Sequence, residues 1–449
     1  MSTVAIAAVG SRGDVVPLAG LGAALQSAGH RVVIAAYTPF ADVITETGCE
    51  FRELTADFTP GTDHADATSK ETFAAIFTPQ GQRDTGQLIL EALNDVPADI
   101  LALPPLAELA GHPLAEARAI PSIGVRLQPL SKTAHHPPTL LGAWSLGGPG
   151  NRMVAATAAW TIDRLYSGVV ADIRRDLGLP KASTRTLRRR RTQAHWPILH
   201  GYSPNVLPRP TDWRSGLQVT GYWWPPTPPG WQPPQQLTDF LAAGPSPVFI
   251  GLGSTVVTAA RAQQLADIIA AALRHAGVRG VVQAGWAGID VTGADILTIG
   301  DTPHEWLFPK MAAAAHHCGA GTTAAALRAG IPSISLPGPF GDQPFWAHRL
   351  HELGTALAPL PQRSLTSQRL ADTIRATLDD TALRKAAQHL AARIAVEDGT
   401  ATAVAAIEEL LQPSHRRCTA CCSARPSTSR AAPRSRPSAA SVRPTEGDV

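Results

Sequence analysis

Short apolar runs alternate with helical patterns along most of this chain. The opening consists of VAIAAV at 4–9, a polar turn, a helical pattern over 18–30, and RVVIAA at 31–36. Continuous apolar runs of this kind are typical of strands covered on both faces, as in parallel sheets. Pro17 stands at the expected first position of the helix, a place that proline favours. The pattern predicts a right-handed βαβ unit.

The same rhythm continues at 98–103 and 120–127, and a second series starts after residue 246. The apolar runs of that second series are PVFIGLGS at 247–254, RGVVQAG at 279–285, ILTIG at 296–300, AAAAHHC at 312–318 and SISLP at 333–337, with helices over roughly 258–276 and after Gly321. The two series predict an α/β protein with two facing Rossmann-like domains and a cleft between them.

Composition changes mark the domain boundaries. The segment 221–234, GYWWPPTPPGWQPP, is too rich in proline for a helix or a central strand and is interpreted as a linker. We therefore predict domains at 1–220 and 235–412. The remaining segment, 413–449, is dominated by Ser, Arg, Pro and Ala and is expected to be a disordered tail.

Charge and cysteine content exclude several classes of protein. The net charge is +3, and the tail alone carries seven Arg against one Glu and one Asp, so the predicted domains carry about −2. No bias toward nucleic acid follows. The five cysteines form no regular framework, and no apolar run is long enough to span a membrane. We expect a cytoplasmic protein whose contact with membranes, if any, is peripheral.

In a parallel α/β sheet, ligands bind beyond the carboxyl ends of the strands. The loops there are expected at 10–16, 251–255, 301–306, 317–323 and 338–343.

The stretch HHCGAGTT at 316–323 has the features of an anion site. A strand is expected to end at His317-Cys318 and a helix to begin near Thr322, with the small residues Gly319, Ala320 and Gly321 between them. The free N–H groups of the helix end, with His317 and the hydroxyls of Thr322 and Thr323, would bind a phosphate or diphosphate. The alternative is that a threonine only caps the helix.

Three further positions are candidates, each with a structural alternative. Asp342 and Gln343 follow the next strand and suit the hydroxyls of a sugar, but Asp342 could instead cap a helix. Ser254, in the loop GLGS, could hold a phosphate oxygen. Asp14, in GSRGDVVP, could take a proton from a hydroxyl or could cap the helix that follows.

Other clusters are weaker candidates. His316 and His317 are neighbours in a strand and point to opposite faces, and no D-x-D is present, so no metal site is predicted. Cys318 is interpreted as packing rather than as a nucleophile. The arginine run at 188–191 is expected in a solvated loop, and the HRRCTACC of the tail lacks a second pair of metal ligands.

Taken together, GSRGDVVP and HHCGAGTTAAALRAGIPSISLPGPFGDQPFWAHRLHELG resemble the inverting glycosyltransferases of the GT-B fold, in the branch that glycosylates sterols and antibiotics. LQPLSKTAHHPP at 127–138 and the segment 202–224 resemble the same branch, so the similarity covers about 1–412. In this chain Cys318 replaces a glycine that is usual in the sterol branch.

The resemblance implies a role for each candidate. Residue Asp14 would be the general base, and the adjacent Gly13 would bind the donor. His317, Ser254 and the turn from Gly319 to Thr323 would bind the diphosphate, and Asp342 with Gln343 would bind the sugar. The acceptor would lie along roughly 58–90 and 127–160, and the partner of the nucleotide base stays unassigned between Trp286, Trp306 and others.

The implied activity is an inverting, metal-independent transfer of a hexose to a hydroxyl of a lipophilic acceptor, such as a sterol, a macrolide or another secondary metabolite. The donor would be a nucleotide diphosphate sugar, UDP-glucose before a TDP-deoxysugar, acting as co-substrate with no cofactor and no bound metal. Closure of the two domains over the linker would exclude water. Two alternatives stay open: a non-catalytic nucleotide-sugar-binding homologue, and a sugar-nucleotide epimerase of the same fold.

Overall fold

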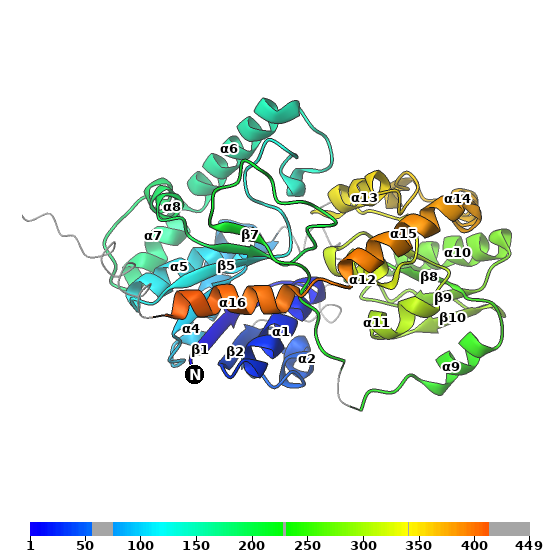
Figure 1. Cartoon of the computed structure of the whole chain (residues 1–449), viewed down its shortest axis with the longest axis horizontal. Coiled ribbons are helices and arrows are strands. Elements are labelled where there is room, and N and C mark those ends of the chain that lie inside the picture. The colour runs from blue at the N-terminus through cyan, green and yellow to red at the C-terminus, as the bar shows by residue number, and fades with distance from the viewer. Residues whose placement is uncertain (56–74, 228–229, 340, 413–449) are drawn as a thin grey trace, which may run out of the picture.

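The computed structural model describes residues 1–55, 75–227, 230–339 and 341–412. It is an α/β protein with two parallel sheets, each flanked by helices (Figure 1). The predicted fold class is therefore confirmed.

The first sheet has seven strands in the order β3-β2-β1-β4-β5-β6-β7, and every neighbouring pair is parallel. Its strands are β1 (Thr3–Ala7), β2 (Arg31–Ala36), β3 (Glu50–Glu53), β4 (Ile100–Leu103), β5 (Ser122–Arg126), β6 (Ile198–His200) and β7 (Leu217–Val219). Strand order changes direction between β1 and β4, which is where doubly wound sheets open a crevice for ligands.

Seven described helices belong to this part of the chain. They are α1 (Arg12–Ser27), α2 (Ala41–Thr45), α4 (Pro79–Leu93), α5 (Glu108–Ala117), α6 (Gly147–Leu165), α7 (Ser167–Asp176) and α8 (Thr184–Gln193). The first core contains the apolar side chains of β1, β2 and β4 together with Val15, Leu18, Leu21 and Leu25 of α1.

The start of α1 differs from the prediction. The helix begins at Arg12, so Pro17 lies inside it and not at its first position. The physical reason is a capping box: Ser11 is the N-cap, and Asp14 accepts hydrogen bonds from the backbone N–H and the hydroxyl of Ser11 at 2.9 and 3.0 Å. Asp14 therefore belongs to the first turn of the helix.

The second sheet has five parallel strands in the order β10-β9-β8-β11-β12. They are β8 (Val248–Gly251), β9 (Gly280–Gln283), β10 (Ile296–Ile299), β11 (Ala313–His316) and β12 (Ser333–Ser335). The helices that follow the first domain are α9 (Gln235–Ala242), α10 (Ala259–Ala276), α11 (His304–Leu307), α12 (Ala320–Ala329), α13 (Gln343–Glu352), α14 (Ser367–Asp379), α15 (Thr381–Ile394) and α16 (Gly399–Leu411).

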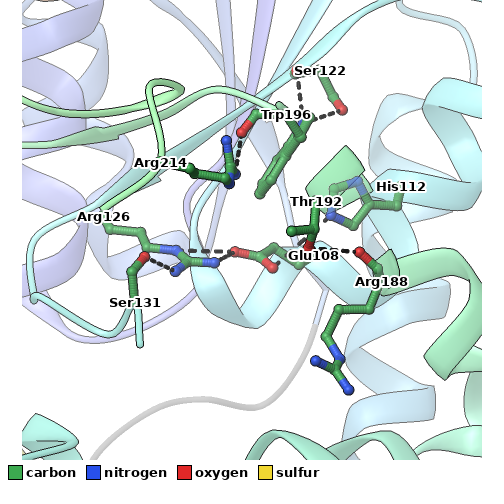
Figure 2. Close-up of polar contacts among 9 residues, drawn as sticks. All are labelled: Glu108, His112, Ser122, Arg126, Ser131, Arg188, Thr192, Trp196 and Arg214. Carbon is green, nitrogen blue, oxygen red and sulfur yellow. Dashed lines mark hydrogen bonds and ion pairs between the residues drawn. The ribbon is translucent and has the colours of Figure 1, made fainter. Parts of the chain in front are cut away.

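The arginine run at 188–191 lies in helix α8, which corrects the prediction of a loop. Ser183 caps this helix by accepting a hydrogen bond from the N–H of Thr186 at 3.2 Å. Figure 2 shows the polar cluster beside it, in which Arg126 donates to Glu108 at 2.6 Å and His112 packs edge-on against Trp196 at 4.5 Å.

The Pro-rich segment packs against both domains. Tyr222 and Trp223 are 8% and 1% exposed and belong to two different cores, and Trp224 lies under the guanidinium of Arg328 at 4.5 Å. The described part of 221–234 holds no regular secondary structure. The chain crosses between the domains at Tyr222–Trp224, and we call this packed segment the strap.

Helix α16 lies along the first domain although its sequence follows the second (Figure 1). Its residues Ala403, Val404 and Ile407 join the core of the first domain. Gly399 packs so closely against the backbone of Gly221 and Tyr222 that an added Cβ would lie 2.4–2.5 Å from them. The C-terminal helix therefore ties the second half of the fold back to the first.

Across the described residues, no helix combines the length and the apolar character that a membrane-spanning helix requires. The tail, 413–449, lies outside the described residues.

Candidate active site

A cavity of about 890 Å³ lies between the two domains, within the usual range for small-molecule sites. All five loops predicted from the strand ends contribute residues to its wall: 10–16, 251–255, 301–306, 317–323 and 338–343. The loops predicted beyond the carboxyl ends of the strands therefore meet at one cavity. Both sheets point this edge toward the same space, which is why loops distant in sequence meet there.

The N-terminus of α12 opens onto the cavity. The helix begins at Ala320, with Gly319 as its N-cap, rather than near Thr322 as predicted. Its first intrahelical hydrogen bond is donated by Thr323 to the Gly319 carbonyl at 3.0 Å, so the N–H groups of Ala320, Gly321 and Thr322 precede the helical ladder. These groups and the helix dipole favour an anion at this end.

The imidazole of His317 is held between two glycines. A Cβ added to Gly253 or to Gly319 would lie 2.4 Å from an atom of this ring. Burial lowers the pKa of His317 to about 4, against which backbone hydrogen bonding to Gly251 acts in the opposite direction. The ring is therefore neutral at pH 7 in this state and adds no formal positive charge to the site.

The two residues beside His317 are structural. Strand β11 ends at His316, before the predicted end at His317-Cys318. The side chain of His316 is fully buried, and its Nε2 lies 3.1 Å from the hydroxyl of Ser333. Cys318 is also fully buried, with φ +63°, and burial raises the pKa of its thiol to about 12. The left-handed conformation is one that glycine adopts without strain, and the thiol is unsuited to act as a nucleophile.

Asp14 lines the cavity from the first domain. Burial raises its pKa, and hydrogen bonds from Ser11 and Gln128 partly oppose that effect. Asp14 therefore caps the helix and is also available for chemistry, because the residue whose carboxylate closes the capping box also lines the cavity. A Cβ on Gly321 would lie 4.0 Å from the Cα of Gly13, so the N-termini of α1 and α12 approach each other.

Asp342 and Gln343 line the cavity from the second domain. Asp342 occupies the N-cap position of α13, but its carboxylate accepts from the indole N–H of Trp346 at 2.8 Å and makes no capping hydrogen bond. Burial, assisted by the charge of Asp14, raises its pKa to about 6. The side-chain oxygen of Gln343 accepts from the Gly338 N–H at 2.8 Å, which leaves its amide N–H groups to donate.

Sequence reasoning did not single out Gln128. Its carboxamide interacts with both Asp14 and Asp342 and lowers the pKa of each. Gln128 is the second residue after strand β5. This position beyond a strand end is the feature of the sequence that could have identified it as a site residue. It connects the two carboxyl groups across the cleft.

Of the remaining predicted residues, Ser254 and Trp286 line the cavity and Trp306 does not. Ser254 lies in the turn after β8 and lines the cavity. Trp286 also lines it, whereas Trp306 is half-buried and packs against Trp231, with 5.5 Å between ring centroids, and beneath Lys310. Trp286 is therefore the better placed of the two tryptophans considered for a nucleotide base.

The acceptor region predicted at 58–90 and 127–160 is described in part. Residues 58–74 lie outside the described residues, while Phe77, Leu127, Leu130 and Leu140 line the cavity. With Val16 and Val43 they form an apolar wall on the side of the first domain. The protein thus has two α/β domains. Between them lies a cavity onto which the N-terminus of α12, the carboxyl group of Asp14 and an apolar wall open.

Two family models match this sequence. Residues 4–111 match the glycosyltransferase family 28 N-terminal domain, and residues 283–410 match the erythromycin biosynthesis protein CIII-like C-terminal domain.

Curated relatives extend the similarity over most of the chain. It is 33% identical over 421 residues to O-mycaminosyltylonolide 6-deoxyallosyltransferase of Streptomyces fradiae, covering 90% of this chain and 97% of that protein. It is 32% identical over 425 residues to sterol 3-beta-glucosyltransferase UGT80A2 of Arabidopsis thaliana, covering 89% of this chain and 64% of that protein.

Solved structures share the fold. The glycotransferase of kitacinnamycin superposes with a TM-score of 0.68 at 19% identity, covering 92% of this chain and 99% of that one. The spinosyn rhamnosyltransferase SpnG complexed with thymidine diphosphate superposes with a TM-score of 0.59 at 19% identity, covering 91% and 100%. The chain therefore belongs to the GT-B glycosyltransferases, in the branch that contains sterol glucosyltransferases and antibiotic glycosyltransferases.

Proposed function

We propose that this glycosyltransferase moves a hexose from a nucleotide diphosphate sugar to a hydroxyl of a lipophilic acceptor, with inversion at the anomeric carbon and without a bound metal or cofactor. UDP-glucose is the first donor to test and a TDP-deoxysugar the second. The observation that carries the proposal is the approach of Asp14, in the first turn of α1, to the N-terminus of α12 across one cavity.

The proposed step is a single displacement. Asp14 takes the proton of the acceptor hydroxyl as that oxygen bonds to the anomeric carbon, while the bond from this carbon to the diphosphate breaks and the electron pair leaves with the diphosphate. The transition state is oxocarbenium-like. The raised pKa of Asp14 supports its role as base, because a more basic carboxylate accepts a proton more readily.

The leaving diphosphate would lie against the N-terminus of α12. The free N–H groups there and the hydroxyl of Thr322 are oriented before the reaction begins, which is the arrangement that stabilises developing negative charge. His317 and Ser254 would add hydrogen bonds from neighbouring loops, and Asp342 with Gln343 would bind the sugar hydroxyls. The helix end supplies the charge stabilisation that a metal provides in other transferases.

The acceptor class is inferred from two sources. The apolar wall of the first domain suits a lipophilic molecule, and the relatives are named for action on a macrolide precursor and on sterols. SpnG, which shares the fold, is described with thymidine diphosphate, which supports a nucleotide diphosphate as leaving group.

The first experiment is a donor screen by isothermal titration with UDP, TDP and GDP, comparing wild type with His317→Ala. Tight binding of one diphosphate, weakened in the variant, is expected. Incubation of that donor sugar with sterol and macrolide acceptors, with and without EDTA, then gives the product. Free sugar or an epimer in place of a glycoside would identify the epimerase, and no turnover would identify a binding protein.

The catalytic role of Asp14 has a direct test. General-base assistance typically contributes about 10²–10⁴-fold, so Asp14→Asn should lower kcat by about that factor. Because asparagine keeps the hydrogen bond from Ser11, the dissociation constant of the donor should stay close to that of wild type. Near-normal kcat in this variant would exclude Asp14 as the base.

A further inference from the structure

Large apolar side chains are exposed along one segment of the first domain, at 140–165. Among the described residues, the exposed large hydrophobic side chains other than Met1 and Val396 all fall between positions 140 and 165. They are Leu140, Leu141, Trp144, Leu146, Met153, Trp160, Ile162 and Leu165, each between 45% and 64% exposed. Several large apolar side chains exposed along one segment point to an interaction site, whereas single exposed ones do not. We call it the 140–165 apolar surface.

Helix α6 carries the centre of this surface. Leu146, its N-cap, and the helical residues Met153 and Trp160 are seven residues apart, so they lie along one face of the helix. These three side chains are 60%, 64% and 55% exposed, and Asn151 is the only residue that α6 buries. Asn151 anchors the helix by donating to the Ala134 carbonyl at 3.1 Å. In Figure 1, α6 stands at the outer edge of the first domain.

Arginines lie beside the C-terminal end of α6. Arg164 on α6 is exposed, as are Arg185, Arg189 and Arg190 on α8. Figure 2 shows Arg188 turned away from the Glu108 cluster, and its guanidinium pairs with Asp163 of α6 at 2.6 Å, which places α8 beside the C-terminal end of α6. The nearby acids are paired as well, since Asp172 of α7 bonds Arg83 at 2.8 Å.

We propose that the 140–165 apolar surface docks onto an anionic lipid bilayer. Apolar side chains that include a tryptophan, with arginines beside them, suit the boundary between headgroups and acyl chains. A second copy of this chain fits less well, because a two-fold interface would bring the arginines of both copies together. The docking site does not depend on the transferase chemistry.

The surface also reaches the cavity. Leu140 is 49% exposed and at the same time lines the cavity wall, so apolar side chains continue from α6 to the cavity. If the proposed function holds, a lipophilic acceptor could pass from the bilayer into the cavity with little exposure to water. Contact with a bilayer would explain why apolar side chains at 140–165 are exposed, although their contact with water is unfavourable.

The test is flotation of the full chain with vesicles of phosphatidylcholine alone or mixed equally with phosphatidylglycerol. Wild type should bind the anionic vesicles, and salt should weaken this binding. Leu146→Gln, Met153→Gln and Trp160→Gln together should weaken it by about tenfold or more, because apolar area then no longer leaves water. Val396→Gln is the matched control. Val396 is an apolar residue that is 85% exposed and lies outside the 140–165 apolar surface, so this variant should bind like wild type.

Hydrogen exchange of the wild-type chain locates the contact independently of any variant. Peptides from 147–165 should exchange more slowly when anionic vesicles are added. Binding that survives the triple substitution, with no protection of α6, would assign membrane affinity to the arginine-rich tail and overturn the proposal. Absence of vesicle binding would overturn it too, as would concentration-dependent dimers without lipid that the triple substitution abolishes.

Discussion

Single residues in the cavity influence each other's ionisation. Asp14 and Asp342 come from different domains, yet the charge of Asp14 raises the pKa of Asp342, and Gln128 interacts with both carboxyl groups. Because two carboxyl groups lie close to one another and are buried, their charged forms lower the stability of the folded protein. Such a loss of stability is common where a site serves function.

Gln128 is a positioning residue whose effect should appear in the pH profile. Gln128→Ala removes an interaction that favours the charged form of Asp14, so the pKa of that carboxyl should rise. The acid limb of kcat/KM should move to higher pH, because the base must be deprotonated to act. Gln362→Ala is a suitable control, since Gln362 also lines the cavity but bonds the Leu336 carbonyl. An unchanged acid limb in Gln128→Ala would contradict this role.

Asp342 should reduce stability at neutral pH. Its pKa is raised from 3.8 to about 6 in the folded state, so the folded protein binds this proton more readily than the unfolded chain. The stabilisation that comes with the proton is present at low pH and lost as the pH rises through 6. Asp342→Asn should therefore raise Tm at pH 7.5, and the gain should be smaller at pH 4.5, as measured by calorimetry. A constant gain would point to packing rather than charge.

At the scale of elements, two helix N-termini and their glycines build the site. The capping box places Asp14 in the first turn of α1, and Gly319 lets α12 begin next to His317. The close approach of Gly253 and Gly319 to the His317 ring leaves no room for a Cβ at either position.

Gly253→Ala should weaken binding of the donor diphosphate. The added Cβ would lie 2.4 Å from the His317 ring, and overpacking of about 1–3 kcal/mol corresponds to about 5-fold to 100-fold in affinity. Gly288→Ala is the matched control: Gly288 has φ +63° against +59° for Gly253, and nothing lies within 4 Å of its added Cβ. Equal losses in both variants, by titration, would assign the effect to backbone strain alone.

On the scale of the whole molecule, several contacts join the two domains, among them the following three. The strap at Tyr222 and Trp223 packs into both cores, α16 returns to the first domain, and Arg12 pairs with Asp301 across the cleft at 3.5 Å. Any closing motion must therefore leave the strap and α16 in contact with the first domain.

Gly399→Ala should loosen α16. The added Cβ would lie 2.4 Å from the backbone of Gly221. The resulting strain should lower the free energy of unfolding by about 1–3 kcal/mol. Hydrogen exchange of residues 399–411 should become faster. Gly168→Ala, in α7 with nothing near its added Cβ, should instead stabilise by about 0.5–1 kcal/mol. Unchanged exchange in Gly399→Ala would show that α16 docks through its apolar face alone.

Much of the fold could be predicted from local pattern. Strands at 4–9, 247–254, 279–285 and 296–300 and the helix at 258–276 appear close to where periodicity placed them, because buried parallel strands require continuous apolar runs. Helix starts were less accurate at α1 and α12, since the capping partners Ser11 and Gly319 determine them and the apolar pattern does not.

The sequence by itself determined the two βα series, the strand ends that form the cavity wall and the residue types suited to a diphosphate and a hydroxyl. These features depend on contacts between near neighbours in the chain. Only the tertiary structure decided that Gln128 joins Asp14 to Asp342, that α16 lies on the first domain, and that one face of α6 stays uncovered. Each of these depends on segments that are far apart in sequence, and their packing leaves no periodic trace in either segment alone.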